Sequence, residues 1–273
     1  MKAKDLYPAV FSRHAKEYAR RLDEIMARGE ARGRTLALQA VEARPGMRVL
    51  DIACGPGTLT RMLAAMVSPG GQVVGVDLAK GMIALAREAA PANATFEVMD
   101  MEHLAFEDSS FDAAVCGHGL QFAPDLGAAL REARRVLRTD GRLAASVPAA
   151  AMKEEVWALV DDVVDRWLPP PPRVVDNEAT RAAVRDAGAL RQAALAAGFA
   201  GAQVEEVTEE VVWASAEQLV SRLMSWWDFA FRLEEMDVSR RTEFAEEATA
   251  AVRRKHPGAI TTHGRTLVLV ATA

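Results

Sequence analysis

Two glycines separated by one residue, Gly55 and Gly57, form the part of this sequence best suited to approach a ligand. They follow an apolar run at 49–53 that carries one carboxylate, Asp51. Glycine lets the backbone come close to a ligand, and a helix that begins after Gly57 would point unpaired N–H groups at that ligand. This pattern predicts a site for a nucleoside-like cofactor.

The residues around the two glycines indicate which cofactor to expect. A dinucleotide fingerprint has a third glycine, whereas Thr60 stands at that position, and no Lys-Ser or Lys-Thr pair follows as in a P-loop. The Asp51 carboxylate would repel a pyrophosphate but attract the ammonium and sulfonium groups of S-adenosylmethionine. The sequence therefore favours S-adenosylmethionine over NAD.

Two further acidic residues follow the next two predicted strands. Asp77 ends the apolar run at 72–77, about 20 residues beyond the second glycine, where a carboxylate accepts ribose hydroxyl groups. Asp100 and Met101 follow the run at 95–99 and suit the amino group and the face of an adenine ring. Together with the carboxylate ahead of the glycines, they predict a single cofactor site at one edge of a sheet.

Several segments between Val49 and Val147 resemble the class I S-adenosylmethionine-dependent methyltransferases, in particular the small-molecule group that includes the ubiquinone and menaquinone C-methyltransferases. The resemblance implies an α/β fold: a Rossmann-like, doubly wound seven-stranded sheet, parallel with an antiparallel last strand, and helical cover segments. The segments that carry the resemblance are 49–58, 76–82, 100–101, 110–116 and 130–143.

The same resemblance implies a set of residues that bind S-adenosylmethionine, with S-adenosylhomocysteine as the product. An acceptor carbon, oxygen or nitrogen would attack the sulfonium methyl in line, and the protein would mainly supply positioning and exclusion of water. The implied cofactor residues are Asp51, Ala53, Cys54, Gly55, Gly57, Asp77, Leu78, Met82, Asp100, Met101, Glu102 and His118.

Three residues are candidates for a catalytic role. His118 lies just past the fourth strand, at the edge where cofactor and acceptor should meet, and histidine has a reference pKa of about 6.5. Its alternative is a loop histidine whose backbone alone touches the methionine moiety. Gln121 follows the same strand, in a stretch where the family often has a His-His pair, and Glu154 begins the first cover helix. For Glu154 the other interpretation is a solvated helix start, which the helix dipole favours.

Candidate acceptor contacts lie outside the cofactor half. His14 and Tyr18 are four residues apart, share a predicted helix face and would close over the methyl donor. All five tryptophans follow the cofactor half, and an apolar or aromatic acceptor suits a pocket lined by such rings. Plain packing between helices is the alternative for each of these residues. The tryptophans singled out are Trp157, Trp226 and Trp227.

Composition and hydrophobic periodicity predict a core domain with helical additions. A chain of 273 residues, 50% hydrophobic, is long enough to bury a large core. Helices are expected over 8–28 and 34–43, and again over 216–235 and 239–255. The helix over 216–235 is apolar almost all round, so we expect other helices or the acceptor to cover it. The predicted segments are an N-terminal helical cap (1–44), a cofactor-binding core (45–150), a helical lid (151–185), and the end of the sheet (186–273) with an insertion at about 215–262.

The net charge, the cysteines and the absence of targeting segments indicate which partners, metals and cellular location to expect. A net charge of −5 argues against a nucleic-acid partner, because phosphate binding depends on clustered positive charge. Cys54 and Cys116 are the only cysteines and have no metal-ligand spacing, so we expect buried packing residues and no metal site. A redox or covalent role near the cofactor is the alternative for the two thiols. The chain shows neither a signal peptide nor an apolar run of membrane-spanning length, which predicts a cytoplasmic location. The sequence leaves the oligomeric state open between a monomer and a homodimer.

Alternative functions remain open at the level of sequence. A protein of the same fold that binds S-adenosylmethionine could catalyse non-methyl chemistry such as cyclisation. A non-catalytic cofactor-binding module is another alternative, although the intact acidic series disfavours it. An NAD-dependent reductase is opposed by the missing third glycine.

Overall fold

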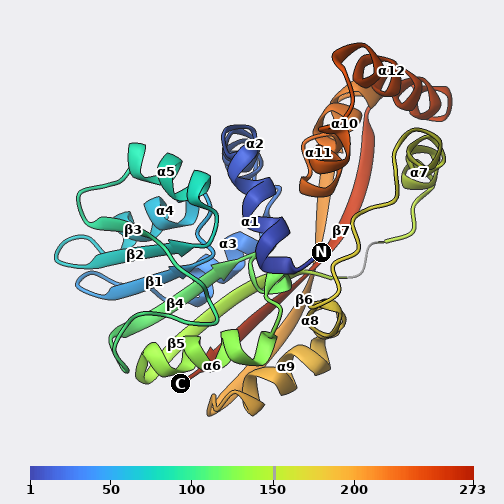
Figure 1. Ribbon diagram of the computed structural model, residues 1–273. Helices are drawn as coiled ribbons and strands as arrows, with labels where there is room; N and C mark the ends of the chain where they lie inside the picture. The colour runs from blue at the N-terminus through green and yellow to red at the C-terminus, as the bar shows by residue number, and fades with distance from the viewer. Residues whose placement is uncertain (150–151) are drawn as a thin grey trace. The chain divides into compact units, whose positions relative to one another are not determined.

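One seven-stranded mixed sheet organises the computed structural model, which describes residues 1–149 and 152–273. The strand order is β3-β2-β1-β4-β5-β7-β6 (Figure 1). The first five strands pair in parallel, and β7 runs antiparallel to β5. The predicted doubly wound sheet with an antiparallel last strand is therefore confirmed. The strands are β1 (Arg48–Ile52), β2 (Gln72–Asp77), β3 (Ala94–Val98), β4 (Phe111–Gly117), β5 (Leu137–Pro148), β6 (Gly201–Trp213) and β7 (Ile260–Thr272).

The direction of strand order reverses between β1 and β4, which are neighbours in the sheet. In open α/β sheets, ligands bind outside the carboxyl ends of the strands at such a point. The topology alone therefore directs attention to the segments that follow β1, β2 and β4.

The chain divides into two compact units. The first contains the described residues up to 149 together with 174–209 and 265–273, and the second contains 152–173 and 210–264. Residues 174–185 thus belong with the sheet, although they fall in the segment predicted as a lid. The predicted boundary between residues 150 and 151 lies outside the described residues.

Helices of the first unit cover both faces of its sheet. On one face Leu50 of β1 packs in the same core as Leu130, and on the other Val49 packs with Leu63. Parallel strands buried on both faces read as continuous apolar runs, which explains why 49–53 lacks alternation. The helices of this unit are α1 (Ala3–Arg13), α2 (Ala15–Ala27), α3 (Arg32–Ala40), α4 (Thr58–Met66), α5 (Lys80–Glu88), α6 (Leu126–Val136), α8 (Glu178–Ala183) and α9 (Ala187–Ala196), with a short 3-10 helix, η1 (Leu120–Phe122).

Both cysteines are free and buried, as expected for packing residues. They lie in the two different cores, Cys116 with the α6 face and Cys54 with the α4 face. Burial raises the pKa of the Cys116 thiol to about 12 and that of Cys54 well above its usual range. Neither thiol is therefore a nucleophile in the folded chain.

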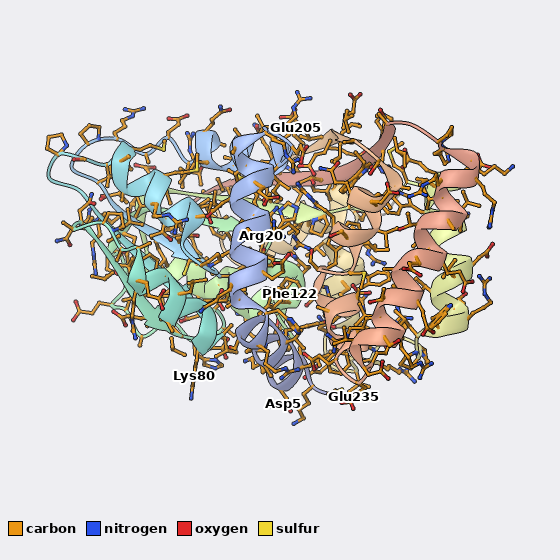
Figure 2. The ribbon with its side chains drawn as sticks, turned by 90° about the horizontal axis from the view of Figure 1, so that it is seen from above. Asp5, Arg20, Lys80, Phe122, Glu205 and Glu235 are labelled. Atoms are coloured by element: carbon orange, nitrogen blue, oxygen red, sulfur yellow. The ribbon has the colours of Figure 1, made fainter. Side chains whose placement is uncertain are left out.

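The predicted N-terminal helix over 8–28 is wrong in its continuity. It begins earlier and divides into α1 and α2 at His14, whose backbone leaves the helical region with φ −102° and ψ 16°. Figure 2 shows Asp5 and Arg20 on these two successive helices. The helix predicted over 34–43 is α3, which begins at Arg32.

The second unit is built mainly from helices around its own core. The helix predicted over 216–235 is instead two helices, because Ser225 Oγ donates to the Arg222 carbonyl oxygen at 2.7 Å and Trp226 is extended. Their apolar faces, including Leu219 and Phe229, pack inside this unit, so its own helices cover them. Its helices are α7 (Glu155–Trp167), α10 (Ala216–Leu223), α11 (Trp227–Leu233) and α12 (Val238–Lys255). Among residues 1–149 and 152–273, no helix has the length and apolar character needed to cross a membrane.

Candidate functional site

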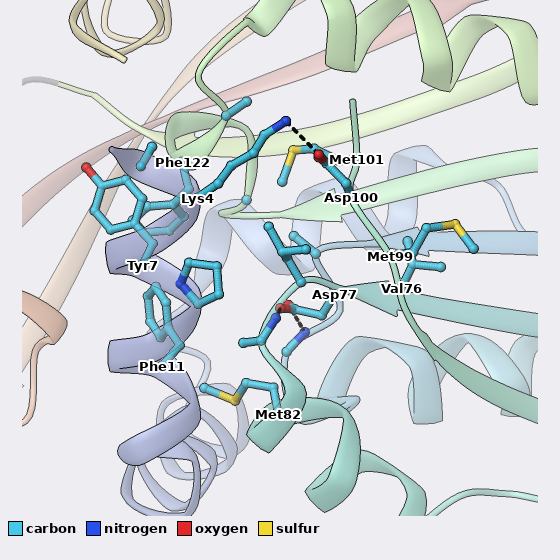
Figure 3. Close-up of a pocket in the computed structure, with 18 of the residues that line it drawn as sticks. Lys4, Tyr7, Phe11, Val76, Asp77, Met82, Met99, Asp100, Met101 and Phe122 are labelled. Atoms are coloured by element: carbon cyan, nitrogen blue, oxygen red, sulfur yellow. Dashed lines mark hydrogen bonds and ion pairs between the residues drawn. The ribbon is translucent and has the colours of Figure 1, made fainter. Parts of the chain in front are cut away.

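A pocket in the first unit opens at the predicted sheet edge. Side chains of α1 form one wall, and Figure 3 shows Tyr7 and Phe11 across from Asp77 and Met82, with Lys4 extending toward Asp100. The other walls come from the turn after β1, the ends of β2 and β4, the segment after β3, and η1. The predicted cofactor residues that line the pocket are Ala53, Gly55, Asp77, Leu78, Met82, Asp100, Met101 and His118.

The glycine turn has the backbone geometry that its sequence predicts. Gly55 and Gly57 have φ of +54° and +80°, in the left-handed region that favours glycine. A Cβ at Gly57 would lie 2.8 Å from the ring of Phe96, so this position also needs a residue without a side chain. Helix α4 begins at Thr58 directly after it, as predicted.

Asp77 is held by the backbone on both of its carboxylate oxygens. Oδ2 accepts the Gly55 N–H at 2.9 Å, and Oδ1 accepts the Ala79 N–H at 2.8 Å. Burial raises the pKa of this carboxyl, and the two N–H donors oppose that effect. Each oxygen retains lone-pair capacity, so the carboxylate can also accept ligand hydroxyl groups.

Asp51 lies deeper than its predicted role requires. Its side chain is 1% exposed and is not part of the pocket lining. Thr60 Oγ1 donates to Oδ2 at 2.6 Å, while Oδ1 has no hydrogen-bond partner among the described residues. Burial raises the pKa of Asp51 to about 7, and the nearby Asp77 adds to the rise. When ionised, the Asp51 carboxylate would attract a cationic ligand in the adjoining pocket. This attraction is electrostatic and needs no direct contact with the ligand.

Three other predicted cofactor residues also lie outside the lining. Cys54 is buried in the core, and Gly57 serves the turn itself. Glu102 is 8% exposed and pairs with Lys4, whose Nζ lies 2.6 Å from Glu102 Oε2 and 2.6 Å from Asp100 Oδ2. The ion pairs of Lys4 thus connect α1 to the segment that follows β3.

His118 is the most constrained of the candidate catalytic residues. It lines the pocket with φ +62°, and its N–H donates to the Ser146 carbonyl oxygen at 2.9 Å. Its Nδ1 lies 2.8 Å from Ser146 Oγ. Burial first, and the charge of Arg34 second, lower the pKa of His118 well below its ordinary value. The lowered pKa makes the imidazole neutral and a weaker base than a free histidine, which weakens the case for the base, one of the two roles that the sequence left open.

An aromatic wall lines the pocket, and of its rings only Tyr18 was predicted from the sequence as a pocket residue. The ring centroids of Tyr7 and Phe122 are 4.8 Å apart, and those of Phe11 and Phe122 are 5.2 Å apart, both edge to face. Tyr18 continues the wall, with its ring 5.5 Å from Phe11. The spacing of Lys4, Tyr7 and Phe11 at one helix face is the signal that would have identified them.

The remaining candidates lie elsewhere. His14 forms the break between α1 and α2 and does not line the pocket, whereas Tyr18, whose N–H donates to the His14 carbonyl oxygen at 3.0 Å, does. Gln121, in η1, donates through Nε2 to the His118 carbonyl oxygen at 2.8 Å and is not part of the lining.

Glu154 and the tryptophans belong to the second unit. Glu154 accepts hydrogen bonds from the His263 backbone at 3.0 Å and from Trp157 Nε1 at 3.1 Å, which replaces the solvated helix start. The Trp157 and Trp226 rings are 5.8 Å apart, and Trp227 begins α11. The lining of the first unit's pocket contains none of them.

The part of the chain that matches a known protein family is the cofactor-binding half. Residues 49–141 match a family described as a methyltransferase domain. Nocamycin O-methyltransferase of Saccharothrix syringae is 34% identical over 229 residues, which cover 77% of this chain and 79% of that protein.

Quinone methyltransferases are similar over a shorter stretch. The 2-phytyl-1,4-naphtoquinone methyltransferase of Synechococcus elongatus is 34% identical over 140 residues, covering 50% of this chain and 60% of that protein. Demethylmenaquinone methyltransferase of Desulfitobacterium hafniense is 37% identical over 126 residues, covering 44% and 50%. The alignment thus spans about half the length of these curated relatives.

Solved structures share the fold at low sequence identity. The YcgJ protein of Bacillus subtilis has a TM-score of 0.54 at 20% identity, covering 88% of this chain and 97% of that one. The [4+2]-cyclase SpnF has a TM-score of 0.51 at 20% identity, covering 88% and 80%. At this identity the likeness describes the architecture alone.

Proposed function

The chain belongs to the class I S-adenosylmethionine-dependent methyltransferases, and on that basis we propose that it transfers a methyl group to a small apolar or aromatic acceptor. Membership rests on the full set of motifs and on a relative aligned over most of both chains. The acceptor and the atom that receives the methyl group are part of the proposal.

The observation that carries the proposal is the convergence of Asp77, Asp100 and the glycine turn on one pocket. Asp77 already fixes the turn through Gly55 and would accept ribose hydroxyls. Asp100 and Met101 would hold the adenine ring on the opposite side. These residues fit the polar groups of S-adenosylmethionine better than a pyrophosphate, which the neighbouring Asp51 would repel.

The protein contributes positioning and electrostatics to the reaction. S-adenosylmethionine, when bound, supplies a methyl group that the sulfonium already activates. His118, neutral and held by Ser146, would orient groups at the reacting edge without taking a proton. The aromatic wall would exclude water and align the acceptor for in-line attack.

The chemistry of the wall supports an apolar cyclic acceptor. Tyr7, Phe11 and Phe122 offer edges and faces to a flat molecule, and aromatic pairs of this kind favour such contacts. The similar proteins named above include methyltransferases for naphthoquinone and menaquinone rings and one O-methyltransferase. Both C- and O-methylation fit this lining.

The test combines calorimetry with mass spectrometry. We expect S-adenosylmethionine and S-adenosylhomocysteine to bind with micromolar dissociation constants and NAD to give no heat. A panel of naphthols and naphthoquinones incubated with S-adenosylmethionine should then show a methyl mass gain in at least one member. Heat from NAD alone would overturn the cofactor assignment. Binding of both adenosyl ligands with a rearranged, unmethylated product would favour cyclisation instead.

A further inference from the structure

On the premise that the pocket binds S-adenosylmethionine as proposed above, we propose that Lys4 of α1 contacts the adenine ring directly. Its ammonium would donate a hydrogen bond to a ring nitrogen, N1 or N7, that flanks the amino group. Lys4 lines the pocket together with Asp100 and Met101, and its side chain is 35% exposed, so a ligand in the pocket can reach it. Figure 3 shows this side chain extending from α1 toward Asp100.

The Lys4 ammonium has one donor to spare. Nζ lies 2.6 Å from Asp100 Oδ2 and 2.6 Å from Glu102 Oε2. An ammonium carries three N–H donors, and no third partner for it occurs among residues 1–149 and 152–273. The remaining donor is therefore available to a ligand in the pocket.

Glu102 holds this ammonium in a fixed position. The Glu102 side chain is almost completely buried, and its other oxygen, Oε1, accepts the Asp125 N–H at 2.7 Å. Asp125 is the N-cap residue of α6, so the carboxylate is anchored to the start of that helix. A lysine held in this way has little side-chain freedom left to lose when a ligand binds, which favours binding.

Asp100 can accept a ligand hydrogen bond beside the lysine. Its Oδ1 accepts the Glu102 N–H at 2.9 Å, and Oδ2 faces Lys4. His103 Nδ1 lies 3.6 Å from Oδ2, beyond hydrogen-bond distance, so this oxygen keeps a free lone pair. Burial opposes the effect, but the hydrogen bond from Lys4 lowers the pKa of Asp100, so this carboxyl is ionised at neutral pH.

An acceptor and a donor side by side match the edge of an adenine ring. The amino group of adenine is a donor, and the ring nitrogens next to it are acceptors. The amino group would donate to Asp100 while Lys4 donates to the adjacent nitrogen. A base with an oxygen in place of the amino group would turn an acceptor toward the Asp100 carboxylate and be repelled. The ion pair thus recognises adenine by its hydrogen-bonding pattern as well as by its shape.

The test uses analogues that lack one ring nitrogen but keep the shape and the amino group. The full-length protein is titrated calorimetrically with S-adenosylhomocysteine and with its 1-deaza and 7-deaza analogues. We expect one analogue to bind at least about 10-fold more weakly than S-adenosylhomocysteine, the effect of losing one hydrogen bond to a charged donor. In Lys4→Met that ratio should fall to about twofold or less, chiefly because S-adenosylhomocysteine itself binds more weakly.

The ratio of affinities is the decisive quantity. Removal of the ammonium leaves Asp100 and Glu102 facing each other, which changes the binding of all three ligands, whereas the ratio reports only the missing nitrogen. Lys2→Met is the matched control, because Lys2 is an exposed lysine directly before α1 whose side chain does not cap the helix. It should keep the full ratio.

Two results would overturn the inference. Equal affinities of all three ligands for the unaltered protein would show that neither nitrogen receives a hydrogen bond. A ratio that persists in Lys4→Met would assign the bond to another donor.

Binding of S-adenosylhomocysteine separates this inference from the proposed function. If the unaltered protein does not bind it, the cofactor assignment fails and the role of Lys4 fails with it. If it binds and the two analogues bind equally well, the cofactor assignment stands and only the contact from Lys4 is overturned.

Discussion

Asp77 accepts the backbone N–H of Gly55 at 2.9 Å, so the carboxylate at the end of β2 and the glycine turn after β1 are one hydrogen-bonded unit. The residue that would bind the ribose also shapes the turn beside it. This double role changes what its removal should do, because a loss of ligand binding cannot be separated from a change in the fold without measuring both.

We expect Asp77→Ala to weaken S-adenosylhomocysteine binding at least about 10-fold and to lower the Tm. Two part-buried N–H groups, of Gly55 and Ala79, lose their acceptor, at about 1 kcal/mol each. Calorimetric titration and thermal unfolding of the same sample check both effects. The exposed Glu88→Ala substitution on α5 is the control and should change neither. Affinity equal to that of the unaltered protein would remove Asp77 from the site.

Asp51 should make stability depend on pH. Its pKa is about 7 in the folded chain, against about 3.9 when unfolded, so the unfolded state releases the proton first. Stability from this group is complete below pH ~4 and is lost as the pH rises through ~7. We expect Asp51→Asn to have the higher Tm at pH 8, with the difference shrinking toward pH 5. A difference that does not vary with pH would contradict this account.

The same carboxyl should make ligand affinity depend on pH in the opposite sense. S-adenosylmethionine is cationic, so it should bind more tightly as Asp51 ionises through pH ~7. In Asp51→Asn this rise should disappear and affinity at pH 8 should fall. Titrations of the two proteins at pH 6 and pH 8 measure it. Parallel pH profiles would assign the dependence to another group.

His118 should stay neutral across the physiological range. Burial and the charge of Arg34 lower its pKa, so its imidazole signal should not titrate between pH 6 and pH 9 in a ¹⁵N NMR experiment. The spectrum of His118→Asn assigns the signal. A midpoint inside that interval would restore the base role that the sequence suggested.

Lys4 should affect the ligand more than the fold. Its side chain is 35% exposed, so the pairs with Asp100 and Glu102 contribute only about 0–1 kcal/mol to stability. We expect Lys4→Met to speed S-adenosylhomocysteine dissociation several-fold, measured by surface plasmon resonance at low and high salt, with little change in Tm. Lys16→Met, an exposed lysine of α2, is the control. An unchanged dissociation rate would show that α1 does not retain the ligand.

The cofactor half was predictable because its signals are local. Left-handed glycines, acidic strand ends and continuous apolar strands can each be read from a few neighbouring residues. The aromatic wall could not be read this way, because Phe122 meets Tyr7 and Phe11 only after the chain has folded. The depth of Asp51 was also hidden, since its contact with Thr60 depends on how α4 packs on the strand.

In the N-terminal helices and the second unit, the sequence predicted where helices lie but not where they are interrupted. Hydrophobic periodicity gave helices in the correct regions, but it joined segments that hydrogen bonding separates. His14 interrupts the first predicted helix, and the Ser225 side chain competes for a backbone carbonyl within the second.

The reactivity of the two buried cysteines reports local opening of the structure around them. Cys54 follows β1 next to the glycine turn, and Cys116 ends the apolar part of β4. Each cysteine is therefore adjacent along the chain to residues that line the pocket, yet its side chain is buried. An alkylating reagent can reach them only when the surrounding segments detach. The rate of cysteine alkylation therefore measures how often these segments open locally. A ligand that slows the alkylation must stabilise the same segments.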